Sequence, residues 1–156
     1  MPERAPDFVY TIFIAASADK VWDALTDGEM TRAYWGHDNV SDWKPGSRWE
    51  HVRIGAEGRV DIVGKVIEID PPRRLVVSWA SPGEESDPAQ VSRVTYAVAA
   101  LDSETRLTVT HADLAPGSEM QRGVTQGWPM VLSSLKSCLE TGRGLEMVRQ
   151  RVKRAD

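Results

Sequence analysis

The fold is decided by residues 118–141, SEMQRGVTQGWPMVLSSLKSCLET, which have the pattern of one long amphipathic helix. Ser118 and Gln121 form a capping box at its start. Gly142 follows its end, where glycine adopts a left-handed conformation without strain. At about 1.5 Å per residue, such a helix is roughly 36 Å long and crosses a small domain. Its apolar residues recur at steps of three and four and form one stripe: Met120, Val124, Trp128, Val131, Leu132, Leu135 and Leu139.

The chain before this helix is dominated by predicted strands. Residues 8–14 are β-branched and aromatic, which predicts a first strand. Two short helices follow, the first capped by Ser17 and the second over residues 29–35. From there the apolar residues alternate, first over 47–53 and 59–70, then at Leu75, Val77 and Trp79, at Val94, Tyr96 and Val98, and at Leu107, Val109 and His111.

This order of elements predicts an α+β fold in which a curved antiparallel sheet wraps around a long C-terminal helix. A curved sheet and a straight rod do not match in shape, so we expect a gap between them, and function is expected there. Residues 1–156 are predicted to be one domain with a core over about 8–142. Two outcomes stay open for the basic segment 143–156, which either prolongs the helix or frays.

The composition excludes several classes of function. A net charge of −4 argues against a nucleic-acid-binding surface, which would be basic. No apolar run approaches the length of a membrane span, and the first ten residues do not have the pattern of a signal peptide. Cys138 is the sole cysteine, so no internal disulfide can form. A cytoplasmic protein without contact to membranes is therefore predicted.

Three histidines, His37, His51 and His111, are scattered without the spacing of a metal site, so neither a metal nor a cofactor is predicted. His111 ends the Leu107/Val109 face, which should point at the long helix. A neutral imidazole there could hydrogen-bond a ligand or act as a base. The favoured alternative is a core-edge histidine whose nitrogens are bonded to a neighbour or to water, because buried polar groups normally have partners.

The acidic residues of the strands do not indicate catalysis. Asp61 with Lys65, and Glu68 with Asp70, have the spacing of charges on a solvated outer face of a strand. The sequence contains no GxSxG motif, phosphate-binding loop or dinucleotide-binding motif. No catalytic residue is therefore predicted.

Six tryptophans in 156 residues are the most informative side chains. Trp79 and Trp128, from a strand and the long helix, are expected to face the gap, and Trp35 and Trp43 are expected near its mouth. Core packing accounts for buried tryptophans, because a large buried side chain contributes roughly 1.5–3 kcal/mol. Lining of a cavity is the alternative, because binding pockets are mostly apolar and aromatic.

The long helix contains three residues that weaken it. Gly123 and Gly127 are four residues apart and form a notch on one side, although each costs about 1 kcal/mol relative to alanine. Pro129 cannot donate to the carbonyl group of Thr125, so a kink or a restart of the helix is expected there.

Several stretches resemble the START-like superfamily with the helix-grip fold, and within it the heat-shock-protein-90 ATPase activator homologue type. They are residues 16–25 (ASADKVWDAL), 64–75 (GKVIEIDPPRRL) with Ser78-Trp79, 92–95 (SRVT), 105–111 (TRLTVTH), and Gly127-Trp128 with the leucines that follow. A glycine pair is usual before the third strand, where this chain has Gly46-Ser47. The resemblance implies a hydrophobic cavity beneath the last helix and no shared catalytic motif.

Three functions follow as hypotheses. The first is binding of a small hydrophobic or aromatic ligand in the gap. The second is a co-chaperone-like interaction module. Such a module would bind a chaperone and act in the stress response. The third is a cyclase or hydrolase with His111 as base. A homodimer is compatible with each. The predicted ligand-binding residues are Trp35, Trp49, Trp79, Tyr96, His111, Val124, Trp128, Val131 and Leu135.

Overall fold

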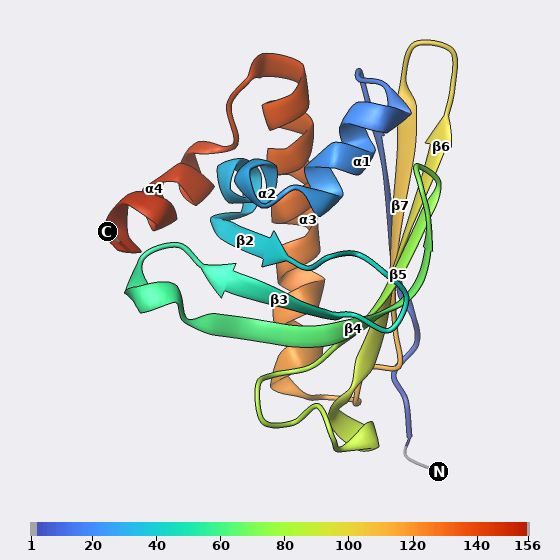
Figure 1. Cartoon of the computed structure of the whole chain (residues 1–156), viewed down its shortest axis with the longest axis vertical. Helices are drawn as coiled ribbons and strands as arrows, with labels where there is room; N and C mark the ends of the chain where they lie inside the picture. The colour runs from blue at the N-terminus through green and yellow to red at the C-terminus, as the bar shows by residue number, and fades with distance from the viewer. Residues whose placement is uncertain (1–2, 156) are drawn as a thin grey trace.

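The structure, a computed structural model, describes residues 3–155 and contains a curled sheet around a long helix (Figure 1). The strands are β1 (Phe8–Ile14), β2 (His37–Val40), β3 (Arg48–Arg53), β4 (Val60–Asp70), β5 (Arg74–Trp79), β6 (Ser92–Ala100) and β7 (Thr105–Ala112). The helices are α1 (Ala18–Thr26), α2 (Gly28–Trp35), α3 (Glu119–Thr141) and α4 (Glu146–Ala155), with short 3-10 turns at Ala56–Gly58 and Pro88–Gln90.

All neighbouring strands of the sheet are antiparallel, in the order β1-β7-β6-β5-β4-β3-β2. In Figure 1 the sheet curls around α3, and α1 and α2 lie across the same side. This confirms the predicted α+β helix-grip fold. Strand β2 was not predicted, because its sequence, HDNV, contains residues that are poor strand formers. These four residues pair with β3 alone.

Helix α3 begins and ends as the sequence indicates. The Ser118 hydroxyl accepts from the backbone N–H of Gln121 at 3.1 Å, and Gly142 adopts a left-handed conformation after the last turn. The Gln121 side chain reaches back to the N–H of Gly117 rather than to that of Ser118. Five residues of the predicted stripe are buried together with Ser134, namely Val124, Trp128, Val131, Leu132 and Leu135, whereas Met120 and Leu139 are partly buried.

Pro129 does not restart the helix, because α3 is continuous from Glu119 to Thr141. Of the two expected outcomes, the restart is therefore wrong, and the kink stays a prediction. A proline inside a helix costs about 3 kcal/mol, whereas each large apolar side chain buried along this stripe returns roughly 1.5–3 kcal/mol. Tertiary packing on both sides of Pro129 therefore outweighs the missing hydrogen bond.

The segment after Gly142 neither extends α3 nor frays, but folds back as α4, which contacts α2. Gly144 makes this turn feasible, since a Cβ there would lie 2.7 Å from the carbonyl oxygen of Ala33. Val148 of α4 is buried. The basic side chains of residues 151–154 lie outside the part of the chain whose side chains are described.

The ladder between β4 and β5 opens at one point, next to Gly64. Val66 pairs with Val77, and Val63 with Ala80, but between these pairs the backbone carbonyl oxygen of Ser78 accepts from the indole Nε1 of Trp49 at 2.8 Å. A Cβ on Gly64 would lie 1.8 Å from that same oxygen. Glycine is therefore required for the close approach of these two strands.

Candidate ligand cavity

A cavity of about 120 Å³ lies between α3 and the inner face of the sheet. The sequence predicts a gap and a functional site at this place. Helix α2 contributes its last residue, and strands β3 and β5 contribute one residue each. The remaining lining comes from consecutive turns of α3. The lining residues are Trp35, His51, Trp79, Gly123, Val124, Gly127, Trp128 and Val131.

The notch formed by Gly123 and Gly127 belongs to this cavity. A Cβ placed on either glycine meets no described atom within 4 Å, so open space replaces the two missing side chains. Gly123 is exposed, and the cavity therefore reaches the surface beside it. The two glycines weaken the helix by about 1 kcal/mol each and provide no packing in return.

Trp79 lies at the centre of an aromatic cluster, which we define as Trp35, Trp49, His51, Trp79, His111 and Trp128. Its ring centroid lies 5.3 Å from those of Trp49 and His111, 5.6 Å from that of Trp128, and 6.1 Å from that of His51. These separations are typical of favourable aromatic contacts. The cluster fixes the orientation of the indole ring that forms the inner wall of the cavity.

The indole N–H of Trp79 is a buried donor without an acceptor. Trp79 is 4% exposed, and no described residue accepts a hydrogen bond from its Nε1 atom. Leaving a buried donor unsatisfied costs about 1–3 kcal/mol. The indoles of Trp49 and Trp128 both have acceptors, Ser78 O and His111 Nδ1 respectively. Among the fully buried indole nitrogens of the described cluster, that of Trp79 is therefore the one without an acceptor.

His51 provides the complementary group. Its Nδ1 donates to the side-chain oxygen of Asn39 at 2.5 Å, so the neutral ring carries a lone pair on Nε2. This Nε2 has no hydrogen-bond partner among residues 3–155 and is not sealed from open space. Burial, and then the charges of His37 and Arg53, hold the pKa of His51 well below its usual value. At neutral pH, His51 therefore presents an acceptor to the cavity.

A polar network holds His51 from behind. The His37 ring stacks on it with centroids 3.8 Å apart and an interplanar angle of 5°. His37 Nε2 donates to Asp61 at 2.8 Å, and Arg53 and Arg59 also reach this carboxylate, at 2.8 and 3.1 Å. Burial alone would raise the pKa of Asp61, but the hydrogen bonds from His37 and Arg53 lower it.

Asp61 is thus not the solvated outer-face charge that the sequence predicts, because the unpredicted strand β2 brings His37 against it. Its side chain is only 15% exposed. Lys65, Glu68 and Asp70 are exposed, in agreement with the prediction.

His111 is satisfied within the core. The indole of Trp128 can only donate, so His111 Nδ1 accepts from it at 3.0 Å and the proton is on Nε2. That Nε2 donates to the hydroxyl of Ser92 at 2.8 Å, and Ser92 in turn donates to the carbonyl oxygen of Trp79 at 3.2 Å. His111 does not line the cavity among the described residues, so its two nitrogens are not available to a ligand. Burial lowers its pKa from 6.5 to about 4.

A pH dependence of stability follows from these two histidines. Because the pKa of His111 falls from 6.5 to about 4 on folding, the unfolded chain binds the proton first as the pH decreases. His51 contributes in the same direction. The contribution of His111 is fully present above pH 6.5 and is lost progressively down to about pH 4, by about 3 kcal/mol in total.

Urea unfolding of wild type and His111→Gln from pH 7 to pH 4 measures this effect. Glutamine offers one donor and one acceptor, and the carboxylates are the same in both proteins. We expect the variant to be less stable at pH 7 and to lose less stability on acidification. Parallel pH profiles of the two proteins would contradict the assignment of a neutral, buried His111.

The structure brings together five of the nine predicted ligand-binding residues: Trp35, Trp79, Val124, Trp128 and Val131 line the cavity. The other four, Trp49, Tyr96, His111 and Leu135, are buried in the core and do not line it within the described chain. Trp49 and Tyr96 instead line a separate crevice of about 10 Å³ near Trp43. His51 was missed, although it lies two residues after Trp49 on one strand and so shares its inward face.

Other kinds of site are not evident in the described part of the chain. Nowhere in residues 3–155 do three histidine, cysteine, aspartate or glutamate side chains gather as metal ligands would. No described helix combines the length and the apolar character needed to cross a membrane.

A curled antiparallel sheet that grips a long helix over an aromatic cavity places the chain in the START-like superfamily of helix-grip proteins. A sequence model of the family "Activator of Hsp90 ATPase homolog 1-like protein" matches residues 15–140, and the chain belongs to this family. No curated protein sequence matches the chain significantly.

Solved structures with the same fold come from several bacteria. The Aha1 dimer from Colwellia psychrerythraea is 22% identical, covers 90% of this chain and 100% of its own, and has a TM-score of 0.72. CalU16 from Micromonospora echinospora is 23% identical over 98% of this chain and 92% of its own, with a TM-score of 0.69. ChR145 from Cytophaga hutchinsonii is 27% identical over 90% of this chain and 97% of its own, with a TM-score of 0.71.

Proposed function

We propose that the protein binds a small, uncharged ligand built around one aromatic ring with a hydroxyl group, in the cavity beneath α3. The observation that carries this proposal is the buried indole N–H of Trp79, which has no acceptor among the described residues. This nitrogen is sealed from open space in the structure, so a ligand oxygen would satisfy it only after the side chains around it shift. Buried polar groups in native proteins are nearly always hydrogen-bonded, so the exception at a cavity wall requires a reason.

The size of the cavity supports a single ring. It measures about 120 Å³, and an apolar cavity of roughly 150 Å³ in another protein holds benzene. Trp35, Trp128 and Val131 provide flat and branched apolar walls. A longer substituent could leave through the notch at Gly123, which is exposed.

The polar groups of the cavity support a hydroxyl group in particular. Trp79 offers a donor and His51 an acceptor on neighbouring rings, whose centroids lie 6.1 Å apart, and the proposed hydroxyl group bridges the two. A hydroxyl group can accept from the indole and donate to the imidazole at once. His51 is the one titratable side chain among the described lining residues, and its neutral form disfavours a charged ligand.

The same lining supports binding rather than turnover. The described lining residues contain no serine, cysteine or carboxylate that could act as nucleophile or acid. The enzyme hypothesis requires His111 as a base, but both ring nitrogens of His111 are hydrogen-bonded, one to Trp128 and the other to Ser92.

Isothermal titration calorimetry with p-cresol and toluene tests the proposal. The two compounds have similar shape and differ in one hydroxyl group. We expect p-cresol to bind about ten-fold tighter than toluene, because satisfying a buried donor is worth about 1–3 kcal/mol. In Trp79→Phe the donor is absent, so the difference between the two compounds should disappear. Trp22→Phe, in which an indole outside the cavity is removed, is the matched control and should keep the difference.

Equal affinity for the two compounds in the wild type would contradict the proposal, as would the absence of any heat. The chaperone-activating role named in the family description would then be the stronger candidate, and the ATPase rate of Hsp90 with and without the protein measures it. The Colwellia relative is a dimer, and a homodimer of this chain stays a prediction that sedimentation can test.

A further inference from the structure

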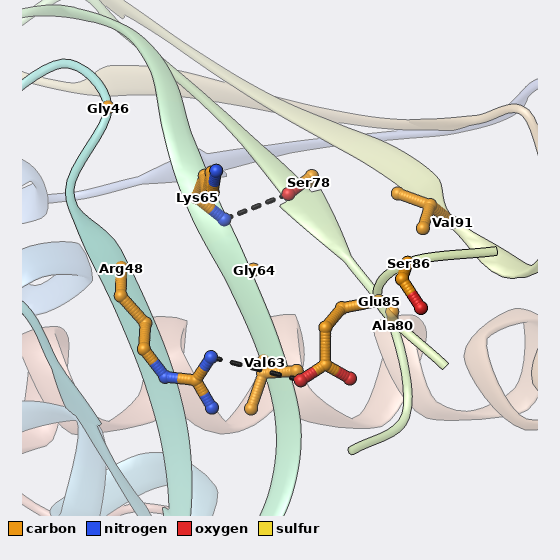
Figure 2. Close-up of a pocket in the computed structure, with 10 residues that line it drawn as sticks. All are labelled: Gly46, Arg48, Val63, Gly64, Lys65, Ser78, Ala80, Glu85, Ser86 and Val91. Atoms are coloured by element: carbon orange, nitrogen blue, oxygen red, sulfur yellow. Dashed lines mark hydrogen bonds and ion pairs between the residues drawn. The ribbon is translucent and has the colours of Figure 1, made fainter. Parts of the chain in front are cut away.

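A second and larger cleft lies on the opposite, outer face of the sheet. It measures about 510 Å³ and opens between strands β3, β4 and β5 and the segment that leads from β5 to β6 (Figure 2). Figure 2 shows α3 behind the sheet, so this cleft is separate from the cavity. The residues that line it are Gly46, Arg48, Val63, Gly64, Lys65, Ser78, Ala80, Glu85, Ser86 and Val91.

The floor of the cleft is apolar. Val63 and Ala80 pair across β4 and β5, and they are 0% and 1% exposed. Outer-face residues of a one-layer sheet are usually solvated, so the burial of these two shows that the segment from Ser81 to Val91 covers them. The apolar lining side chain that a ligand in the cleft can reach is Val91, which is partly exposed.

The rim carries two positive charges on neighbouring strands, and the guanidinium group of Arg48 is turned toward Glu85 rather than toward Lys65 (Figure 2). Arg48 on β3 and Lys65 on β4 are directly paired in the antiparallel register, and like charges in this arrangement repel. Arg48 contacts Glu50 at 3.1 Å, whereas Glu85 approaches it only to 3.9 Å. Within residues 3–155, no ion pair involves Lys65. An anion bound at this rim would reduce the repulsion between the two cations.

A hydroxyl group beside these charges adds a further donor. The Oγ atom of Ser78 accepts from the backbone N–H of Lys65 at 2.8 Å, and its own hydrogen is not donated to any described residue. Figure 2 shows this bond next to the Lys65 side chain, with Glu85 reaching across from the covering segment. The cleft thus combines two cations, a hydroxyl donor and an apolar floor.

We propose that this outer cleft binds a small organic carboxylate with an apolar body. The carboxylate binds Arg48 in place of Glu85, with Lys65 as the second cation of the rim, and the body lies beside Val91, which is partly exposed. Glu85 occupies the side of Arg48 as an internal competitor, so the incoming anion displaces it. The inference rests on a different face and on different residues from the proposed function.

Two-dimensional ¹H–¹⁵N NMR with benzoate tests this proposal, with benzamide as the uncharged analogue. Two signals report on the cleft floor, the indole of Trp49 and the backbone N–H of Lys65, because both hydrogen-bond to Ser78. We expect both signals to shift saturably with benzoate, with an affinity about five-fold higher than for benzamide. The indole of Trp79, in the inner cavity, should stay in place.

Four exposed-residue variants sharpen the test. Arg48→Gln and Lys65→Gln should each weaken benzoate binding, and Glu85→Gln should strengthen it, because the competitor loses its charge. Arg74→Gln, on the neighbouring strand β5 and paired with Glu68, should bind like wild type. The proposal is overturned if the cleft signals do not move, if benzamide binds equally well, or if the Arg48 and Lys65 variants bind like wild type.

Discussion

Gly64→Ala is expected to lower the free energy of unfolding by at least about 3 kcal/mol. The added methyl group would lie 1.8 Å from the carbonyl oxygen of Ser78 and 2.4 Å from the indole nitrogen of Trp49. Both neighbours are fixed, since one is backbone and the other is hydrogen-bonded to that backbone. Strands β4 and β5 must separate to admit the methyl group. Urea unfolding monitored by circular dichroism measures the loss.

Gly127→Ala is the matched control for this experiment. A methyl group there meets no described atom within 4 Å, and alanine is the better helix former by about 1 kcal/mol. The control should therefore be more stable than wild type. A Gly64→Ala variant within about 1 kcal/mol of wild type would show that the ladder at Ser78 is looser than described.

Gly127→Leu is expected to weaken binding of p-cresol strongly without loss of stability. Gly127 lines the cavity and faces open space, so a leucine side chain would enter the volume that the ligand requires. Helix propensity gains about 1 kcal/mol from the same change. We expect affinity to fall at least about ten-fold while the unfolding free energy rises. Weaker binding together with higher stability would indicate that the glycine keeps the site open at the expense of stability.

Calorimetry with p-cresol and urea unfolding measure the two effects side by side. Gln126→Leu, one residue earlier on the exposed side of α3, is the control and should bind p-cresol like wild type. A Gly127→Leu variant that retains wild-type affinity would show that the ligand does not occupy this cavity.

The fold could be predicted from sequence because its decisive element is local. Ser118, Gly142 and the stripe between them define α3 with little reference to the rest of the chain. The alternating strands then leave one arrangement, a sheet wrapped around that helix. Strand β2 could not be predicted, since its four residues gain their pairing only from β3.

Some residues of the site could be predicted from sequence and others could not, and the difference between them has a physical reason. Trp79 and Trp128 were identified by type and by face, and the structure places both on the cavity wall. Trp49 also faces inward, but the open ladder at Gly64 draws its indole to Ser78 and away from the cavity. Which indole lacks an acceptor depends on such distant contacts, and alternation along a strand does not encode them.

The measurement that tests the central claim most directly is the ¹H–¹⁵N signal of the Trp79 indole during titration with p-cresol. If the ligand hydroxyl accepts the orphaned N–H, this proton should move downfield with p-cresol, and toluene should not produce that movement. The indole signals of Trp49 and Trp128, whose N–H groups already have acceptors, should move less. A Trp79 signal that stays in place at saturating p-cresol would contradict the account.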